Sequence, residues 1–416
     1  MDASSPTLLR CDAKRLWKTL EASGEIGRVG ERGLRRLALS DEDRMMRDLF
    51  VGWANEAGCE VAVDEVGNIF ARRSGLDPEL PLVAIGSHLD STICGGRYDG
   101  ILGVLAGLEI VRVLNDAKSK TRRGIEIVCW TDEEGARFSR SMMGSSAFAG
   151  IYEVPSVLGA VDKNNKSFGV ELERIGYAGK LPAGQRKFDS YFELHIEQGP
   201  ILDASDKDAG IVYGSYEVRG RRFIFRGETA HVGPTPMDMR HNTLAAAGRA
   251  IAAIDDIGWR QHESGGKTTV ARIECHPNLY GIIPDRVEIG VDFRHPDGNC
   301  MAEMSRGIDQ AVRDAAARAQ VTCEMADQWS FGGFSFANEL VSLLRSTATE
   351  MDLPYLDMRS QAGHDAYSIA KVTPTVMIFT PCKDGITHNF AEDIEMERTM
   401  PGVDLLLNAV VKRADR

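Results

Sequence analysis

Residues 83–100 read VAIGSHLDSTICGGRYDG, and this stretch sets the expectation for the fold of the chain. An apolar run that passes into a polar, glycine-rich segment predicts a buried strand whose carboxyl end opens into a crevice, where open α/β sheets bind ligands. The segment after the strand supplies His88, Asp90 and Asp99, side chains of the types that bind metal ions. Taken alone, the spacing of His88 and Asp99 fits a buried, hydrogen-bonded polar pair better than a metal site. Further metal-binding side chains elsewhere in the chain are needed to favour a metal site.

The sequence that follows has the pattern of a parallel α/β sheet. Apolar residues recur at helical spacing from 100 to 117, and GIEIVCW at 124–130 predicts a second buried strand. Strand, helix and strand in this order predict parallel strands with helices packed on the sheet. After residue 211 the pattern changes to extended segments and two helices, which indicates an inserted α+β unit, and a helix at 336–351 marks the return of the first pattern. At 416 residues the chain exceeds the size at which one hydrophobic core stops growing, so two domains are expected.

Further metal-binding side chains occur where predicted strands end. Glu133 and Glu134 follow the strand at 124–130, and a strand within 191–200 carries His195. Because the carboxyl ends of parallel strands meet at one edge of a sheet, we expect these side chains to converge. Such a set suits two divalent cations that share a carboxylate and activate a water molecule, with Glu133 free to accept the proton of that water. The candidate ligands are His88, Asp99, Glu134, His195 and His388.

The composition narrows the class of protein. A chain that is 43% hydrophobic and 26% charged is typical of soluble globular proteins, and a net charge of −12 disfavours nucleic acid and anionic membranes as partners. The start of the chain lacks a signal-peptide pattern and no window approaches a membrane span, so a cytoplasmic protein is expected. The eight cysteines form no CxxC pair and are expected to be reduced. Cys94 lies in the candidate metal loop, where the lack of a second cysteine favours packing over a ligand or nucleophile role.

Taken in order, these motifs resemble the hydantoinase/carbamoylase branch of the M20 metallopeptidase superfamily. The branch includes N-carbamoyl-L-amino acid hydrolases, β-ureidopropionases, and allantoate and ureidoglycolate amidohydrolases. The resemblance covers nearly the whole chain and is most specific in GSHLDS, GGRYDGILGVLAGLE, TDEEGARF, HIEQGP, GETAHVGPTPM, AGHDA and THNFAE. It implies a catalytic domain with a mostly parallel sheet and a dinuclear metal site, formed by residues 1–211 plus 326–416. It also implies an inserted lid and dimerisation domain, 212–325, and hence a homodimer.

The resemblance also implies roles for individual residues. Asp99 would bridge the two ions, Zn²⁺ or Mn²⁺ with Co²⁺ or Ni²⁺ as further candidates, and Glu133 would be the general base. His231 would polarise the scissile carbonyl, and Arg294 would hold a substrate carboxylate through a bidentate pair; in some relatives such groups act in the other subunit's site. Without the resemblance, His231 would be read as a loop histidine and Arg294 as part of a surface ion pair. The expected substrate contacts are Gln198, Arg294, Asn278 and His364.

Three positions depart from the branch pattern. Gly281 stands where many carbamoylases have an asparagine that helps to hold the substrate's α-carboxylate, and Asn278 or Tyr280 is a candidate to compensate. Gln361 replaces a small residue, and Phe390 replaces a proline. The Gly281 departure places ordinary N-carbamoyl α-amino acids in some doubt as substrates.

The sequence therefore predicts a homodimeric, two-metal amidohydrolase of a linear ureido bond, with an N-carbamoyl-amino acid hydrolase as the first choice. The alternatives with the same metals are an allantoate or ureidoglycolate amidohydrolase and an aminoacylase-like or peptidase-like enzyme. An alternative of another class is a non-catalytic metal-binding protein. Such a protein has no need of Glu133, a carboxylate beside the ligands that is not itself a ligand.

Overall fold

The computed structural model describes residues 8–138 and 140–416, which divide into two compact units. The first unit contains the described residues up to Tyr213, together with Phe336–Met358 and His364–Arg416. The second contains Gly214–Ser335 and Arg359–Gly363. The boundary expected after residue 325 lies inside a strand that pairs within the second unit, so the division falls later in the chain.

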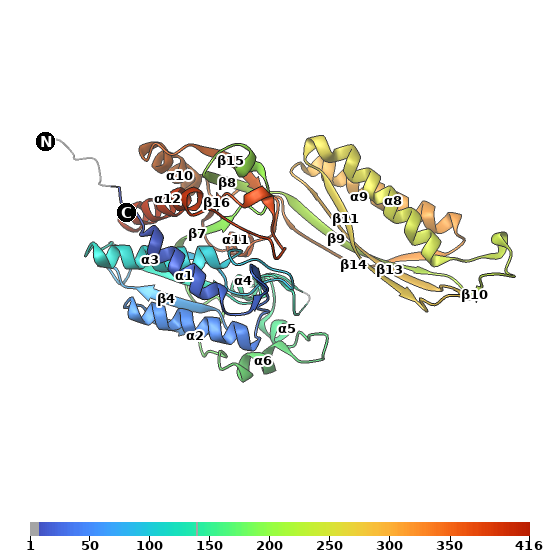
Figure 1. The fold of residues 1–416 in the computed structure, drawn as a ribbon, viewed down its shortest axis with the longest axis horizontal. Helices are drawn as coiled ribbons and strands as arrows, with labels where there is room; N and C mark the ends of the chain where they lie inside the picture. The colour runs from blue at the N-terminus through green and yellow to red at the C-terminus, as the bar shows by residue number, and fades with distance from the viewer. Residues whose placement is uncertain (1–7, 139) are drawn as a thin grey trace. The chain divides into compact units, whose positions relative to one another are not determined.

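The first unit is built on an eight-stranded sheet with strand order β15-β8-β16-β7-β5-β6-β4-β3 (Figure 1). The four central strands, β16, β7, β5 and β6, are parallel, as the sequence predicted. β4 pairs with β6, and β8 with β16, in the antiparallel sense. The strands are β3 (Glu60–Val63), β4 (Ile69–Arg73), β5 (Leu82–His88), β6 (Ile125–Trp130), β7 (Phe188–Ile196), β8 (Ala209–Ser215), β15 (Tyr355–Ser360) and β16 (Thr375–Thr380).

Helices α3 (Ile101–Asp116) and α12 (Met396–Ala414) pack directly on the central strands, and α1 (Ala13–Gly24) contacts both. α3 is apolar around most of its circumference and is buried on most of it, as expected for a helix between a sheet and another helix. The remaining elements of this unit are α2 (Asp41–Glu56), α4 (Met143–Phe148), α5 (Val154–Leu158), α6 (Phe168–Arg174), α7 (Ile201–Ala204), α10 (Asn338–Glu350), α11 (Asp365–Ile369), β1 (Arg28–Val29) and β2 (Gly33–Leu34).

Helices α2 and α12 each show a feature that residue type alone does not settle. In α2, Met46 and Phe50 are buried, but Met45 is 52% exposed, because one residue's rotation about the helix turns it away from the core. In α12, Pro401 lies inside the helix. Ser40 caps α2, accepting a hydrogen bond from the Asp43 backbone N–H.

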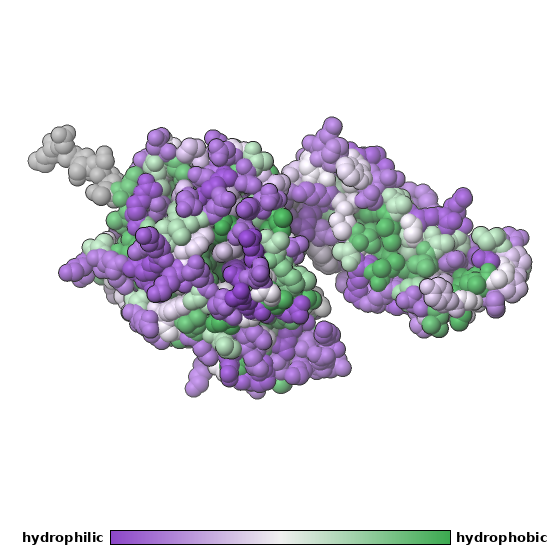
Figure 2. Space-filling model, viewed as in Figure 1, coloured by the Kyte–Doolittle hydropathy of each residue, from purple (hydrophilic) through white to green (hydrophobic). Residues whose placement is uncertain are grey.

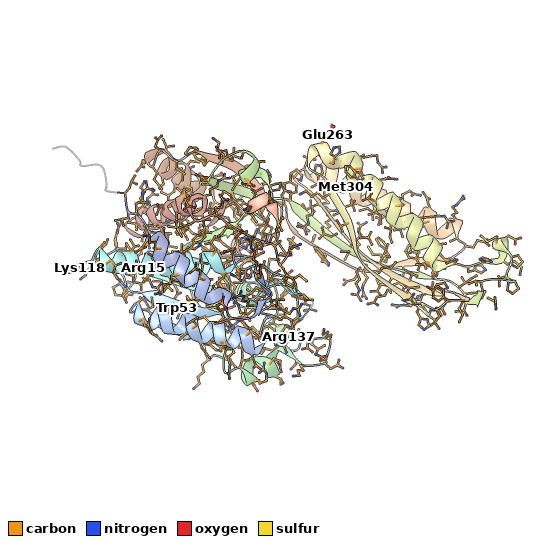
Figure 3. The ribbon with its side chains drawn as sticks, viewed as in Figure 1. Arg15, Trp53, Lys118, Arg137, Glu263 and Met304 are labelled. Atoms are coloured by element: carbon orange, nitrogen blue, oxygen red, sulfur yellow. The ribbon has the colours of Figure 1, made fainter. Side chains whose placement is uncertain are left out.

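The second unit is a four-stranded antiparallel sheet, order β11-β13-β9-β14, with α8 and α9 side by side across it (Figure 1). Every second side chain of β13 points into the core of this unit: Val287, Ile289, Val291 and Phe293. The core also includes Met304 of α9, which is labelled in Figure 3. The elements are β9 (Glu217–Arg226), α8 (Thr243–Gln261), β11 (Lys267–His276), β13 (Arg286–His295), α9 (Gly298–Arg318) and β14 (Thr322–Gly332), with a small pair β10 (Ala230–His231) and β12 (Ile282–Ile283).

On the face shown in Figure 2 hydrophilic residues predominate, and hydrophobic residues gather over part of the second unit. Across residues 8–138 and 140–416, no helix combines the length and the apolar character needed to cross a membrane.

Candidate functional site

The candidate ligands converge at the carboxyl edge of the four parallel strands. His88 is the last residue of β5, and His195 is the next to last residue of β7. Glu134 follows the end of β6, and His388 lies in the segment after β16. Asp99 comes immediately before the turn into α3. The parallel strands and the loop after β5 thus bring side chains from four separate parts of the sequence to one place.

Asp99 lies at the centre of two groups of side chains that are close enough to hold metal ions. Its Oδ1 lies 3.7 Å from Nε2 of His88 and 3.2 Å from Nε2 of His195, all three residues being buried. Its Oδ2 lies 3.5 Å from Nε2 of His388, which in turn lies 3.3 Å from Oε2 of Glu134. One carboxylate therefore faces two separate ligand groups, one with each oxygen. We call His88, Asp99 and His195 the first ligand group, and Asp99, Glu134 and His388 the second. The ions that they would hold are the first and the second ion.

The hydrogen bonds of this cluster fit bound cations. Oδ1 of Asp99 and Nε2 of His195 are buried, and apart from each other, at 3.2 Å, they have no polar partner at hydrogen-bond distance within the described chain. Orphaned buried polar atoms are costly, and a cation between them would remove that cost. Nδ1 of His88 faces the carbonyl of Asp90 at 3.0 Å, and Nδ1 of His195 faces the carbonyl of Ile196 at 2.9 Å. When the proton of each imidazole is on Nδ1, Nε2 can donate its lone pair to an ion beside Asp99. This is the usual arrangement of metal-binding histidines.

The pKa shifts of the buried side chains in this cluster also favour bound cations. Burial, together with the carboxylate of Asp99, raises the pKa of Glu134 to about 8. Burial, together with the carboxylates of Asp365 and Glu134, raises the pKa of Glu133 well above its ordinary value. Burial lowers the pKa of His195, but Asp99 outweighs it and raises that pKa to about 9. Buried carboxylates this close together are unfavourable unless positive charge compensates them, and two divalent ions would supply that charge.

Glu133 lies beside the ligands but belongs to neither ligand group. Its Oε2 is 3.6 Å from Nε2 of His88, and the residue is buried. The backbone N–H groups of Glu133 and Glu134 both donate to the side chain of Asp90, at 3.3 Å each, so Asp90 holds the acidic turn in place. The sequence drew attention to Asp90 but did not assign it this role.

The segment after the acidic turn is anchored by Arg137 (labelled in Figure 3). Its guanidinium donates to Glu171 at 2.6 Å, to Asp162 at 3.2 Å and to the carbonyl of Ala38 at 3.0 Å. Burial makes these charge-assisted hydrogen bonds stronger than surface ion pairs. The turn that carries Glu133 is therefore tied to three other parts of the unit.

Two of the four expected substrate contacts lie next to the metal ligands. Gln198 donates its Nε2–H to Oδ2 of Asp99 at 2.8 Å from a left-handed backbone, φ +59°. The ring of His364 packs against that of His195, with centroids 4.5 Å apart, and both rings are buried. Gln198 thus contacts the shared carboxylate, and His364 flanks the first ligand group.

The other expected contacts lie at opposite ends of the second unit. His231 is on β10, which pairs with β12, and β12 ends three residues before β13 begins. Arg294 is the next to last residue of β13, so the eight residue-to-residue steps from Arg286 to Arg294 separate the two ends by about 26 Å. Asn278 lies just after β11, at the same end as His231. Within one chain, the structure does not bring His231 and Arg294 together.

Some of the N–H groups of Arg294 already donate hydrogen bonds within the chain. Its Nε and Nη2 donate to the carboxylate of Asp292, at 2.8 and 3.1 Å, and its Nη1 donates to the carbonyl of Gln361 at 2.6 Å. A guanidinium carries five N–H groups, so one remains on each terminal nitrogen. Both remaining N–H groups can still donate to a further acceptor.

Comparison with known proteins identifies the family of the chain. The model of peptidase family M20/M25/M40 matches residues 84–412. An N-carbamoyl-L-amino-acid amidohydrolase from Rhizobium meliloti is 39% identical over 98% of this chain and 97% of its own length. A ureidoglycolate hydrolase from Arabidopsis thaliana is 31% identical over 97% of this chain and 87% of its own length. The crystal structure of a hydantoinase/carbamoylase family amidase from Burkholderia vietnamiensis is 42% identical, covers 98% of both chains and superposes with a TM-score of 0.91. The chain therefore belongs to peptidase family M20/M25/M40, in its hydantoinase/carbamoylase branch.

Proposed function

We propose that the protein hydrolyses N-carbamoyl-L-amino acids to the amino acid, ammonia and carbon dioxide, using two divalent cations. The observation that carries the proposal is the placement of Asp99 between two ligand groups with Glu133 beside them. The amidohydrolase from Rhizobium meliloti, similar over nearly the full length of both chains, supports the choice of reaction. The protein is thus a hydrolase of C–N bonds of the ureido or amide type. Zn²⁺ or Mn²⁺ suits the imidazole and carboxylate donors best.

The chain's own residues divide the work of hydrolysis. Bound cations would supply an activated water molecule and polarise the carbonyl. Glu133 accepts the proton of that water through its carboxylate and delivers it to the leaving nitrogen. His231 donates a hydrogen bond to the carbonyl oxygen as negative charge develops there. Arg294 binds the substrate carboxylate with the two N–H groups that Asp292 and Gln361 leave unused.

We further propose that the enzyme works as a homodimer through its inserted unit. His231 and Arg294 are about 26 Å apart or more within one chain, a span longer than any small ureido acid. If both act on one substrate molecule, one of them comes from a second copy. The β10 end of the unit also exposes large apolar side chains that a partner would bury: Met237, Met239, Leu279 and Tyr280.

The second candidate is hydrolysis of ureidoglycolate. The similar plant ureidoglycolate hydrolase favours it. Gly281, with φ +86° and open space where a Cβ would lie, offers no side chain to a substrate carboxylate, and because both candidate substrates carry an α-carboxylate this position does not separate them. A non-catalytic metal-binding protein is disfavoured, because Glu133 would then have no use.

The experiment that tests the reaction measures release of ammonia and amine by the full-length protein loaded with Mn²⁺ or Zn²⁺. Its substrates are N-carbamoyl α- and β-amino acids, allantoate, ureidoglycolate and N-acetyl amino acids. Turnover of N-carbamoyl-L-amino acids that a chelator abolishes and added metal restores is the expected result. Turnover of ureidoglycolate alone would replace the first candidate with the second, and turnover of acyl amides alone would reject both.

A further inference from the structure

Glu392 is a buried carboxylate close to the candidate metal site that belongs to neither ligand group. It lies in the segment between β16 and α12, four residues after His388. Only 1% of its surface is exposed. A carboxylate so deeply buried is retained only where its hydrogen bonds offset the loss of water.

The partners of Glu392 lie in two of the three segments that supply ligands to the second group, namely those of Asp99 and His388. Oε1 accepts the backbone N–H groups of Tyr98 and Asp99, each at 3.1 Å. Oε2 accepts the hydroxyl of Thr387 at 3.1 Å, and that hydroxyl also lies 3.0 Å from Oδ2 of Asp99. Thr387 directly precedes His388 in the chain. Glu392 therefore links the backbone at Asp99 to the residue next to His388.

The chain leaves space for this carboxylate at Gly96. A Cβ added there would lie 2.1 Å from both Cδ and Oε1 of Glu392, closer than atoms can approach. The contact is with the carboxylate itself and not with the flexible end of a surface side chain. Gly96 and Glu392 thus fit as a pair, one in each ligand segment.

His388 needs such an anchor more than the other ligands do. Its side chain is 52% exposed, while those of His88 and His195 are 1% exposed and belong to strands. Its backbone is left-handed, φ +50°, in the irregular segment between a single 3-10 turn, Lys383–Gly385, and α12. Neither burial nor a strand ladder therefore holds its imidazole at the distance from Asp99 that a shared ion requires.

We propose that Glu392 is a positioning residue that holds the His388 segment against the Asp99 segment and so sets the geometry of the second metal site. The inference rests on the two-metal function proposed above. It concerns the ion held by Asp99, Glu134 and His388, because the other ion has two buried histidines on strands. Loss of a carboxylate that supports metal ligands in this way weakens metal binding by about 10–100-fold.

The test is titration of metal-depleted, full-length protein with Mn²⁺, followed by calorimetry, beside thermal unfolding of the metal-free protein. Wild type is expected to bind two ions. Glu392→Ala is expected to bind the second ion about 10–100-fold more weakly and the first nearly as wild type does. Glu392→Gln should restore the second ion to within a few-fold. Its amide oxygen still accepts both N–H groups, and its N–H donates to Thr387, whose hydroxyl then donates to Asp99.

A matched control separates positioning from folding. Glu126 is another fully buried glutamate of the same unit, paired with Arg186 near the amino end of β6 and away from the ligands. Glu126→Ala should lower the unfolding temperature and leave both metal affinities unchanged. If Glu392→Ala does not fold, Thr387→Val removes the shared hydroxyl at little cost in shape and should also weaken the second ion selectively.

Two results would overturn the inference. One is binding of both ions by Glu392→Ala, or by Thr387→Val where the alanine variant is lost, with wild-type affinity. The other is equal weakening of both ions in Glu392→Ala and Glu126→Ala, which would mark a general loss of stability. A wild-type protein that binds a single ion would instead reject the two-metal function, and this result is seen before any variant is made.

Discussion

At the scale of single residues, Glu133 and Glu134 are neighbours in sequence with different expected roles. Only Glu134 belongs to a ligand group, so Glu133→Gln should retain both ions while losing the proton acceptor. We expect its kcat to fall by about 10²–10⁴-fold with little change in metal content. Glu134→Gln is the control and should lose the second ion. Elemental analysis beside steady-state kinetics measures both, and an active, fully metallated Glu133→Gln protein would contradict the assigned mechanism.

Two histidines of the site predict how metal uptake depends on pH. In the metal-free protein Asp99 raises the pKa of His388 to about 9, and it outweighs burial to raise the pKa of His195 to about 9 as well. Both imidazoles are therefore protonated at pH 7, and an ion can bind only after they lose those protons. Metal affinity should increase as the pH rises toward 9 and level off above it.

The measurement is calorimetric titration at pH 7 in two buffers with different enthalpies of ionisation. Protons released by the protein are taken up by the buffer, so the apparent binding heat should differ between the two. The same heat in both buffers would show that the histidines are already neutral, and would contradict the expectation.

At the scale of elements, the turn from β5 into α3 depends on Gly100. It has φ +70°, and a Cβ there would lie 2.3 Å from the ring of His88. Gly100→Ala should destabilise the metal-free protein by about 1–3 kcal/mol and weaken the first ion, because the His88 ring must move. Gly52 in α2 is the matched control, since it has open space and no positive φ. Gly52→Ala should stabilise the protein by about 0.4–1 kcal/mol. Thermal unfolding and metal titration of both variants measure the two effects, and a Gly100→Ala protein with wild-type stability and metal affinity would contradict this expectation.

The elements also show what the sequence could and could not predict. The parallel strands were predictable, because β5 and β6 are short, largely apolar runs that pass directly into polar residues. In β7 the apolar residues Phe192, Leu194 and Ile196 alternate with polar ones. β14 was missed because its alternation of apolar residues is interrupted at Asp327, beside a bulge, and most of its side chains are exposed. The pairing of Gly96 with Glu392 was also beyond the sequence, since it joins positions nearly 300 residues apart and follows no local pattern.

At the scale of the whole molecule, the proposed dimer makes a prediction that a monomeric enzyme cannot satisfy. His231 and Arg294 lie at opposite ends of the inserted unit, so in a dimer each active site would take one of them from each copy. His231→Ala and Arg294→Ala should each be nearly inactive as homodimers. When the two variants are coexpressed, a mixed dimer has one site with both residues intact and one site with neither.

Random pairing makes half of the dimers mixed, so coexpression should recover about a quarter of the wild-type activity. Mixing the two purified homodimers without exchange of subunits should recover none and serves as the control. A coexpressed sample that remains inactive, although both chains copurify in one dimer, would show that the two residues do not serve one site from different copies. Recovery of activity would show that dimerisation through the inserted unit is part of catalysis, because neither chain can then assemble a working site alone.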